Sequence, residues 1–247
     1  MPEESKYIYC VIKCEGERDF AIDGIGGQGD RVYTINYRDL AAVVSDFAGS
    51  RQDVTSQSLK SHQRVMEEVM KEFSVLPVGF GCIASDAAQI RDKVLEAKYR
   101  YLHQTLRQME NKVELVLKAL WMDPQIASQV AANPRLKRLQ RIAATGGTPH
   151  QQFKLGLSVK EELGKHRKKA MKEMLPPLDS IAVDRRLNKV TTPTTMIFNA
   201  SFLVKKEREA EFDRAVNELG EKYGDRVKLI YVGPLPPYDF VDMAIRL

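Results

Sequence analysis

The fold class is read first from Thr195-Met-Ile-Phe-Asn-Ala-Ser-Phe-Leu-Val204 and the residues that follow it. Its uncharged, β-branched and aromatic residues are typical of a β-strand. The next segment, Glu207 to Tyr223, is amphipathic at helical spacing, and Gly224 after it is a typical helix stop. Val227 to Val232 then has the composition of another strand. These elements predict a strand, a helix and a second strand in succession.

The residues before this stretch extend the pattern to a whole domain. Val113 to Trp121 alternates around Glu114 and Lys118 as a strand does, and Ile181 to Leu187 predicts a further strand. The helices predicted between them are Pro124 to Ala132, Leu136 to Ala144, and Gln151 to Leu175, the last ended by Pro176 and Pro177. The order strand, helices, strand, strand, helix, strand is that of a split βαβ sheet, with a helical insertion at about residues 123–175.

The N-terminal part predicts a looser version of the same plan. Its predicted strands are Tyr7 to Lys13, Val32 to Tyr37 and Leu40 to Ser45, and Glu15 to Gly29 has the composition of a loop. The predicted helices are one that begins near Thr55, Ser56 or Ser58 and one from about Asp86 to Met109. We therefore expect an α+β fold of two lobes, a ferredoxin-like variant over residues 1–110 and the split βαβ domain over residues 111–247.

Composition indicates a folded chain without a membrane span. Of 247 residues, 43% are hydrophobic, which is enough for a core. The longest run without a charged residue, Val190 to Val204, has 15 residues, whereas a membrane helix needs about 20 mainly apolar ones. Met1 to Lys6 is acidic and no apolar signal region follows it. Three cysteines form no closed disulfide set, so we expect a cytoplasmic location.

The glycine pattern Gly24-x-Gly26-x-x-Gly29 matches the dinucleotide fingerprint only in spacing. That fingerprint requires the glycines to join a strand to a helix whose N-terminus faces the pyrophosphate. Here the following residues, Asp30 to Ile35, have the composition of a strand. We therefore expect no cofactor at this loop.

Histidines and cysteines show no pattern of a metal site or a nucleophile. His62, His103, His150 and His166 share no ligand spacing, and Cys10 and Cys14 have no second pair. His62 lies on the apolar side of its predicted helix, where a hydrogen-bonded core histidine is expected rather than a catalytic base. Since no acid, base, nucleophile or metal set stands out, we expect a protein that is not an enzyme.

Charge is distributed unevenly along the chain. Between Arg135 and Lys172 there are 11 basic and two acidic residues, a local net charge of +9. The rest of the chain carries 27 basic and 31 acidic residues, a net charge of −4. An electrostatic partner is therefore expected at the 135–172 region, unless these residues form only a solvated helix face.

Binding of RNA or a small ligand by this basic region is the alternative function. A split βαβ sheet can present aromatic residues to single-stranded RNA, and the isoelectric point of about 9.0 is compatible. However, Val78-Gly-Phe-Gly81 matches only the middle of the aromatic motif that such sheets carry. We therefore expect no nucleic acid as the main partner.

Segments across nearly the whole chain together resemble the GvpL/GvpF family of gas vesicle proteins. They are Tyr7-Ile-Tyr9, Tyr37-Arg-Asp-Leu-Ala-Ala-Val-Val-Ser45, His62, Val75-Leu-Pro-Val-Gly-Phe-Gly81, Val113-Glu-Leu-Val-Leu-Lys118, and Gly233-Pro-Leu-Pro-Pro-Tyr-Asp-Phe-Val241. The resemblance implies a non-enzymatic accessory or minor structural protein of the gas vesicle, associated with its shell. It also implies contact with the hydrophobic shell protein GvpA during assembly, limiting its aggregation, and contact with other gas vesicle accessory proteins.

Such a protein needs apolar surface or a sheet edge next to solubilising charge, and the sequence offers two main candidates. The first is Val75 to Phe80, whose Pro77 predicts an edge strand or a closed internal turn. Its candidate residues are Val75, Leu76, Pro77, Val78 and Phe80. The second is the basic region, with Lys165, Arg167, Lys168 and Lys169 as candidates for an acidic face of GvpA. The tail Gly233 to Tyr238 is a third segment, for which internal packing is the expected role.

Overall fold

A computed structural model describes residues 5–26, 29–49, 51–122, 128, 130, 132–189 and 195–241. The chain divides into two units: the first contains residues up to Glu114 and from Pro234 on, and the second runs from Leu115 to Gly233. The sequence-based domain boundary lies between residues 110 and 111, and the chain passes from the first unit to the second after Glu114. The segment from Pro234 on, which the sequence analysis places in the second domain, groups with the first unit. Each unit has its own sheet and helices, as the α+β prediction requires.

The first unit is built on a mainly antiparallel sheet with the order β2-β3-β4-β1-β5, and β6 also pairs with β1. Its strands are β1 (Ser5–Lys13), β2 (Asp19–Asp23), β3 (Arg31–Tyr37), β4 (Leu40–Phe47), β5 (Val75–Pro77) and β6 (Ile83–Ala84). The sequence predicts β1, β3 and β4 correctly. It places β2 in a loop, because only Phe20 and Ile22 of this strand pack against the core while its other side chains are exposed.

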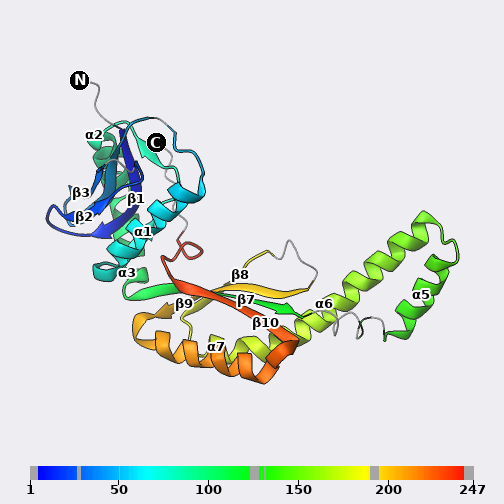
Figure 1. Ribbon diagram of the computed structural model, residues 1–247. Coiled ribbons are helices and arrows are strands. Elements are labelled where there is room, and N and C mark those ends of the chain that lie inside the picture. Colours follow the sequence, from blue (N-terminus) through cyan, green and yellow to red (C-terminus); the bar gives the residue numbers. More distant parts are fainter. Residues whose placement is uncertain are drawn as a thin grey trace. The chain divides into compact units, whose positions relative to one another are not determined.

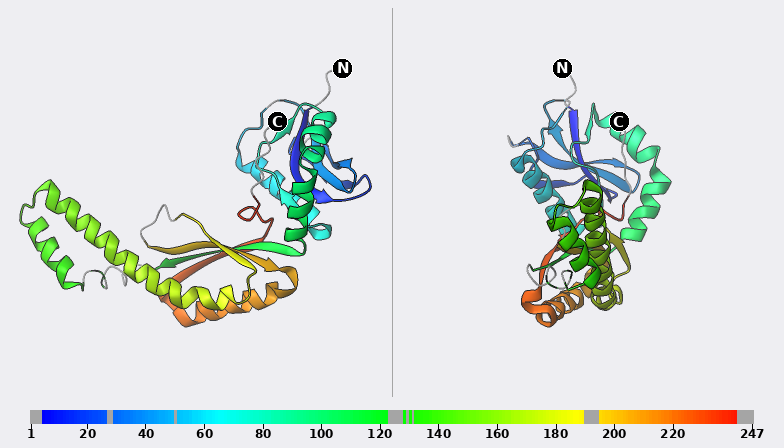
Figure 2. Two further views of the ribbon diagram at one scale, coloured as in Figure 1. Left: turned by 180° about the vertical axis from the view of Figure 1, so that it is seen from behind. Right: turned by 90° about the vertical axis from the view of Figure 1, so that its right-hand side faces the viewer.

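Helices cover both faces of the first sheet (Figure 2, right view). On one face lies α1 (Ser56–Glu72), and its N-cap is Thr55, which forms a capping box with Ser58. On the other face a second helix begins after its N-cap Asp86 and consists of α2 (Ala87–Gln89), the π-helical η1 (Ile90–Glu96) and α3 (Tyr99–Met109). The predicted long helix is thus present from Asp86 to Met109 but is interrupted. In the ferredoxin plan a helix follows the first strand. Among the described residues no helix lies between β1 and β2, so the first unit departs further from this plan than the second unit does.

The second unit has the sheet order β10-β7-β9-β8, which is the order of the split βαβ plan. Its strands are β7 (Lys112–Trp121), β8 (Asp184–Leu187), β9 (Met196–Lys205) and β10 (Val227–Leu235). Helices α6 (Pro149–Asp179) and α7 (Glu209–Tyr223) lie on one face of this sheet (Figures 1 and 2). The rings of Phe202 and Phe212, 5.0 Å apart, join α7 to β9. Short 3-10 helices, η2 (Lys206–Arg208) and η3 (Gly224–Arg226), flank α7.

The helical insertion forms a hairpin of α5 (Pro134–Ala144) and α6, which extends beyond its own sheet (Figure 1, green). With 31 residues, α6 is about 46 Å long. The prediction that Pro176 and Pro177 end α6 is wrong, because the helix continues to Asp179. Buried Leu175 and Leu178 flank the prolines and hold the last turn, so packing outweighs the missing backbone donors. The predicted helix Pro124 to Ala132 lies mostly outside the described residues.

Candidate partner-binding surfaces

The segment Val75 to Phe80 contains an edge strand. β5 ends the order of the first sheet, and no described strand pairs with its outer side. The Val78 N–H donates to the Tyr9 carbonyl at 3.0 Å, which fixes the alternation of backbone groups along β5. The backbone groups of Val75 and Pro77 therefore point away from β1, where the missing N–H of Pro77 costs no sheet hydrogen bond.

The side chains of this segment belong to the core. Val75, Leu76 and Pro77 are buried, and Val78 is only 1% exposed. Phe80 is half-buried, with its ring centroid 5.7 Å from that of His62. A partner at β5 would therefore meet mainly backbone, since the candidate side chains point into the first unit.

His62 is a hydrogen-bonded core histidine, as predicted. The Gly81 N–H donates to the Tyr7 hydroxyl oxygen at 3.0 Å, and the same hydroxyl lies 3.0 Å from His62 Nδ1. We assign the Tyr7 hydroxyl as donor to Nδ1, which leaves the proton of a neutral imidazole on Nε2. Burial lowers the pKa of His62 to about 4. The imidazole is therefore neutral at pH 7, and its polar contacts join β1, α1 and the loop that follows β5.

The C-terminal segment packs within the first unit. The Tyr238 hydroxyl lies 3.5 Å from His62 Nε2, and the Asp239 N–H donates to Glu114 Oε2 at 2.8 Å. Phe240 and Val241 are buried. These contacts give the Pro-rich tail a structural role, so it is a weaker candidate for partner binding than the other surfaces.

The segment Tyr37 to Ser45, one of those that resemble the family, builds a tight hairpin. Arg38 has a φ of +55° between β3 and β4, a conformation that few non-glycine residues adopt. Its guanidinium lies 5.3 Å from the ring centroid of Tyr37 and 5.1 Å from that of Tyr99. These cation–π contacts hold the turn against α3, and the buried strand β4 follows it. This segment is thus explained by the fold.

The glycines at 24, 26 and 29 also have a structural explanation. The next described element is strand β3, as the sequence predicts, so the pattern does not lead into a helix N-terminus as the dinucleotide fingerprint requires. A Cβ on Gly24 would lie 2.5 Å from the Ser45 side chain, which requires glycine where the loop approaches β4. Both Cys10 and Cys14 lie in the core cluster of the same unit, and burial raises the pKa of the Cys10 thiol.

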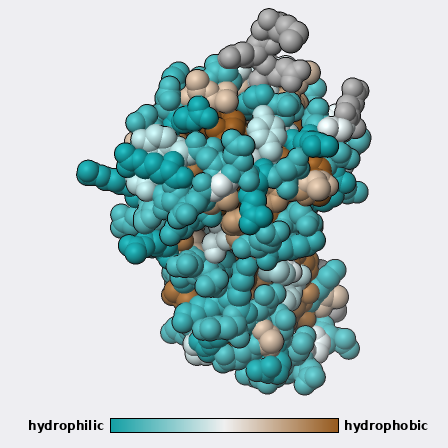
Figure 3. Space-filling view, turned by 90° about the vertical axis from the view of Figure 1, so that its left-hand side faces the viewer, coloured by the Kyte–Doolittle hydropathy of each residue, from teal (hydrophilic) through white to brown (hydrophobic). Residues whose placement is uncertain are grey.

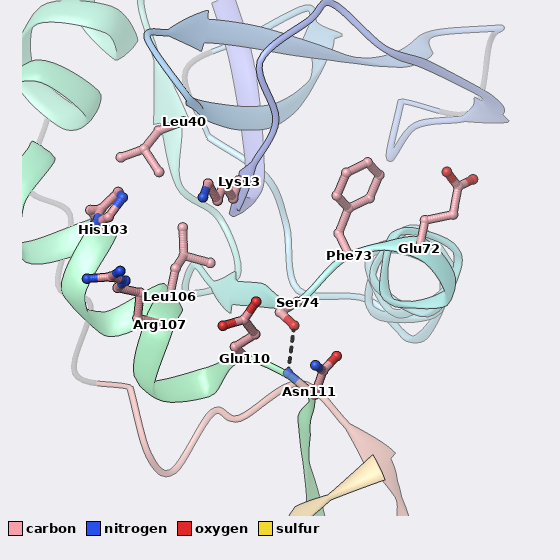
Figure 4. A pocket seen from close by; sticks show the side chains of 10 residues that line it. All are labelled: Lys13, Leu40, Glu72, Phe73, Ser74, His103, Leu106, Arg107, Glu110 and Asn111. Atoms are coloured by element: carbon pink, nitrogen blue, oxygen red, sulfur yellow. Dashed lines mark hydrogen bonds between the residues drawn. The ribbon is translucent and has the colours of Figure 1, made fainter. Parts of the chain in front are cut away.

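A pocket of about 470 Å³ lies in the first unit between the ends of α1 and α3 (Figure 4). Leu40 and Leu106 line it, and the two side chains are buried. Lys13, Arg107 and Glu110 also line it. The lining therefore carries charges of both signs.

The four basic candidates on α6 do not form one surface. Lys165 is exposed and pairs with Glu162 at 3.0 Å, and Lys168 and Lys169 are exposed on the same side of the helix. Arg167 is half-buried, and its Nε donates to the Met196 carbonyl of β9 at 2.9 Å. Arg167 therefore fastens α6 to the sheet, and the three lysines remain as the basic face.

Exposed apolar side chains accompany this basic region, a feature that the sequence analysis missed. Phe153 is 66% exposed and Leu157 is 46% exposed on α6, one helical turn apart. On its other side α6 packs against α5 through a small cluster with Val130 and Leu136. Phe153 and Leu157 fall on a different side of the helix from the apolar residues that face α5. This spacing is the sequence signal that identifies them.

On the face shown in Figure 3, hydrophilic residues predominate and hydrophobic ones form small separate areas. In the described part of the chain, no group of three or more His, Cys, Asp or Glu residues could hold a metal ion. Among the same residues no helix is long and apolar enough to cross a membrane.

Comparison with known proteins gives one consistent family. The model of the family described as "Gas vesicle synthesis protein GvpL/GvpF" matches residues 5–242. The chain is 26% identical over 245 residues to gas vesicle protein F of Haloferax mediterranei, which covers 98% of this chain and 95% of the relative. It is 32% identical over 242 residues to gas vesicle protein F of a Streptomyces species, which covers 96% of this chain and 100% of the relative.

Solved structures agree on the fold. The crystal structure of GvpF from Anabaena has a TM-score of 0.84 at 19% identity and covers 98% of this chain and 100% of its own. That of GvpF from Microcystis aeruginosa has a TM-score of 0.83 at 19% identity and covers 97% and 99%. The two-sheet α+β architecture thus defines the fold class. The chain belongs to the GvpL/GvpF family, and its role is in the gas vesicle.

Proposed function

We propose that this protein is a non-enzymatic accessory or minor structural protein of the gas vesicle that contacts the hydrophobic shell protein GvpA during assembly and limits its aggregation. The observation that carries the proposal is the α5–α6 hairpin, in which α6 exposes Phe153 and Leu157 and also carries the exposed Lys165, Lys168 and Lys169. Exposed apolar side chains offer contact area to a hydrophobic subunit. The neighbouring charges keep the resulting complex in solution.

The basic face of Lys165, Lys168 and Lys169 adds an electrostatic contribution to this contact. Like charges on one helix face attract an acidic surface and speed the first encounter, and salt weakens both effects. Arg167 is excluded from this face because it is bound to β9. The apolar contribution of Phe153 and Leu157 does not depend on salt in this way, so binding should fall with salt without disappearing.

The proposal is tested by capture of purified GvpA on the tagged protein at low and high salt. We expect Lys165→Glu, Lys168→Glu and Lys169→Glu together to weaken capture at low salt, with the difference closing at high salt. A matched control changes Lys60, Lys71 and Lys93 of the first unit to Glu, since Lys71 pairs with Glu68 as Lys165 pairs with Glu162. Equal capture by both variants at every salt concentration would exclude the basic face.

Capture also separates this function from the RNA-binding alternative. Binding of nucleic acid through the 135–172 region would lose several orders of magnitude in affinity as salt rises. If the tagged protein retains RNA and no GvpA, the proposed function is wrong. If it captures GvpA, isolated vesicles washed with urea then distinguish a built-in shell component, which stays, from an assembly factor, which does not.

A further inference from the structure

The last strand of the second unit, β10, is a long edge strand. It has nine residues, and it ends the sheet order next to β7 (Figure 1, red). No strand in the described ranges pairs with its outer side. Six residues, Val227 to Val232, precede Gly233 and Pro234, so an uninterrupted edge of about 20 Å is available.

The side chains of β10 alternate between the helices and the opposite face. Tyr231 faces α7, because its ring stacks on Phe212 at 6.1 Å and its hydroxyl donates to Asp213 at 2.6 Å. Alternation then places Ile230 and Val232 on the opposite face, which α6 and α7 do not cover. Ile230 is 37% exposed and Val232 is 45% exposed.

The other described sheet edges carry protection that β10 lacks. β5 has three residues and contains Pro77. β8 has four residues, three of them charged, and β2 has five, with Asp19 and Asp23 at its ends. Shortness, proline and charge are the usual means of preventing unwanted pairing at an edge. Val227 to Val232 has one charged residue, Lys228, among β-branched, aromatic and aliphatic ones, which is the composition that pairs most readily.

We propose that the outer edge of β10, from Val227 to Val232, is a docking site for an extended apolar segment of a partner, which adds to the sheet as a further strand. The backbone of β10 supplies the hydrogen bonds, and Ile230 and Val232 receive alternate apolar side chains of the added strand. Lys228 on the same face favours an acidic residue at one end of that segment. The inference rests on the proposed function in taking the hydrophobic shell protein as the source of the segment.

The test compares two edges of the same sheet. Ile230→Lys with Val232→Lys places charges where the apolar strand would pack, and we expect capture of GvpA to fall by about tenfold or more. The control, Val183→Lys with Leu187→Lys, changes two residues at the β8 side that are 51% and 50% exposed, and capture should not change. Circular dichroism and Trp121 fluorescence of both variants should match those of the unmodified protein, because the substituted side chains are partly exposed and lie outside the core.

A second probe keeps this inference separate from the proposed function. A short fluorescent peptide in which Val and Thr alternate between terminal Glu residues should bind the unmodified protein by anisotropy, and the β10 variant at least tenfold more weakly. If the unmodified protein captures no GvpA, the proposed function is wrong, and the docking site at β10 is then tested by peptide binding alone. If the β10 variant retains both capture and peptide binding, or if no peptide binds and capture is unchanged, the docking site is refuted.

Discussion

Replacing His62 should abolish a specific loss of stability at mildly acidic pH. His62 is buried next to Tyr7 and Tyr9, and burial holds its pKa at about 4, compared with about 6.5 for an unfolded chain. Between these two values the unfolded state binds a proton and the folded state does not. The free energy of unfolding therefore rises with pH in this window and falls as the pH is lowered.

The size of this effect follows from the two pKa values. Each pH unit between about 6.5 and about 4 changes the free energy of unfolding by about 1.4 kcal/mol, so the full difference is about 3 kcal/mol. At pH 5 the first unit should have lost about 2 kcal/mol relative to pH 7 through this residue alone. His62→Gln should lower stability at pH 7, but it should remove this part of the pH dependence.

Urea unfolding at pH 7 and pH 5 measures the effect by circular dichroism. Trp121, the single tryptophan, lies in the second unit, and its fluorescence should give the same pH dependence in both proteins. His150→Gln is the matched control, because the His150 side chain is already exposed on α6. The reasoning is refuted if His62→Gln and the unmodified protein lose equal stability between pH 7 and pH 5.

Three further outcomes follow from burial and hydrogen bonding. Val78→Lys places an unpaired charge in the core, so it should lower the free energy of unfolding by about 3 kcal/mol or more in urea titrations; an unchanged midpoint would contradict the core assignment. Leu76→Ala should cost about 2–5 kcal/mol in the same titration. Arg167→Ala should cost about 1.5–3 kcal/mol by Trp121 fluorescence, whereas Lys168→Ala should cost less than about 0.5 kcal/mol.

Local sequence patterns predicted much of the fold because their physical causes are local. Thr55 and Asp86 cap helices through side chains within the same turn, and strand composition is sufficient for β1, β3 and β4. The errors arise where distant packing decides. β2 depends on pairing with β3, and α6 passes Pro176 because buried leucines hold its last turn. The return of the tail to the first unit also depends on contacts far apart in sequence.

Candidate surfaces were harder to predict because exposure is a property of the folded chain. Pro77 left an edge strand and a closed internal turn as alternatives, and the structure alone shows that β5 lies at a sheet edge while Val78 faces the core. A cluster of basic residues in sequence also does not show which ones share a helix face, and Arg167 turns to the sheet. The split βαβ order places its last strand at a sheet edge, so the sequence pattern could have predicted that β10 is an edge strand.

Light scattering of GvpA, diluted out of denaturant with and without an equimolar amount of this protein, measures directly whether the protein limits aggregation of the shell subunit. We predict that scattering falls strongly in its presence, and that an unrelated protein of similar size has no such effect. Equal scattering with this protein and with the unrelated one would contradict the account, because a protein that limits aggregation of the shell subunit must slow it under these conditions.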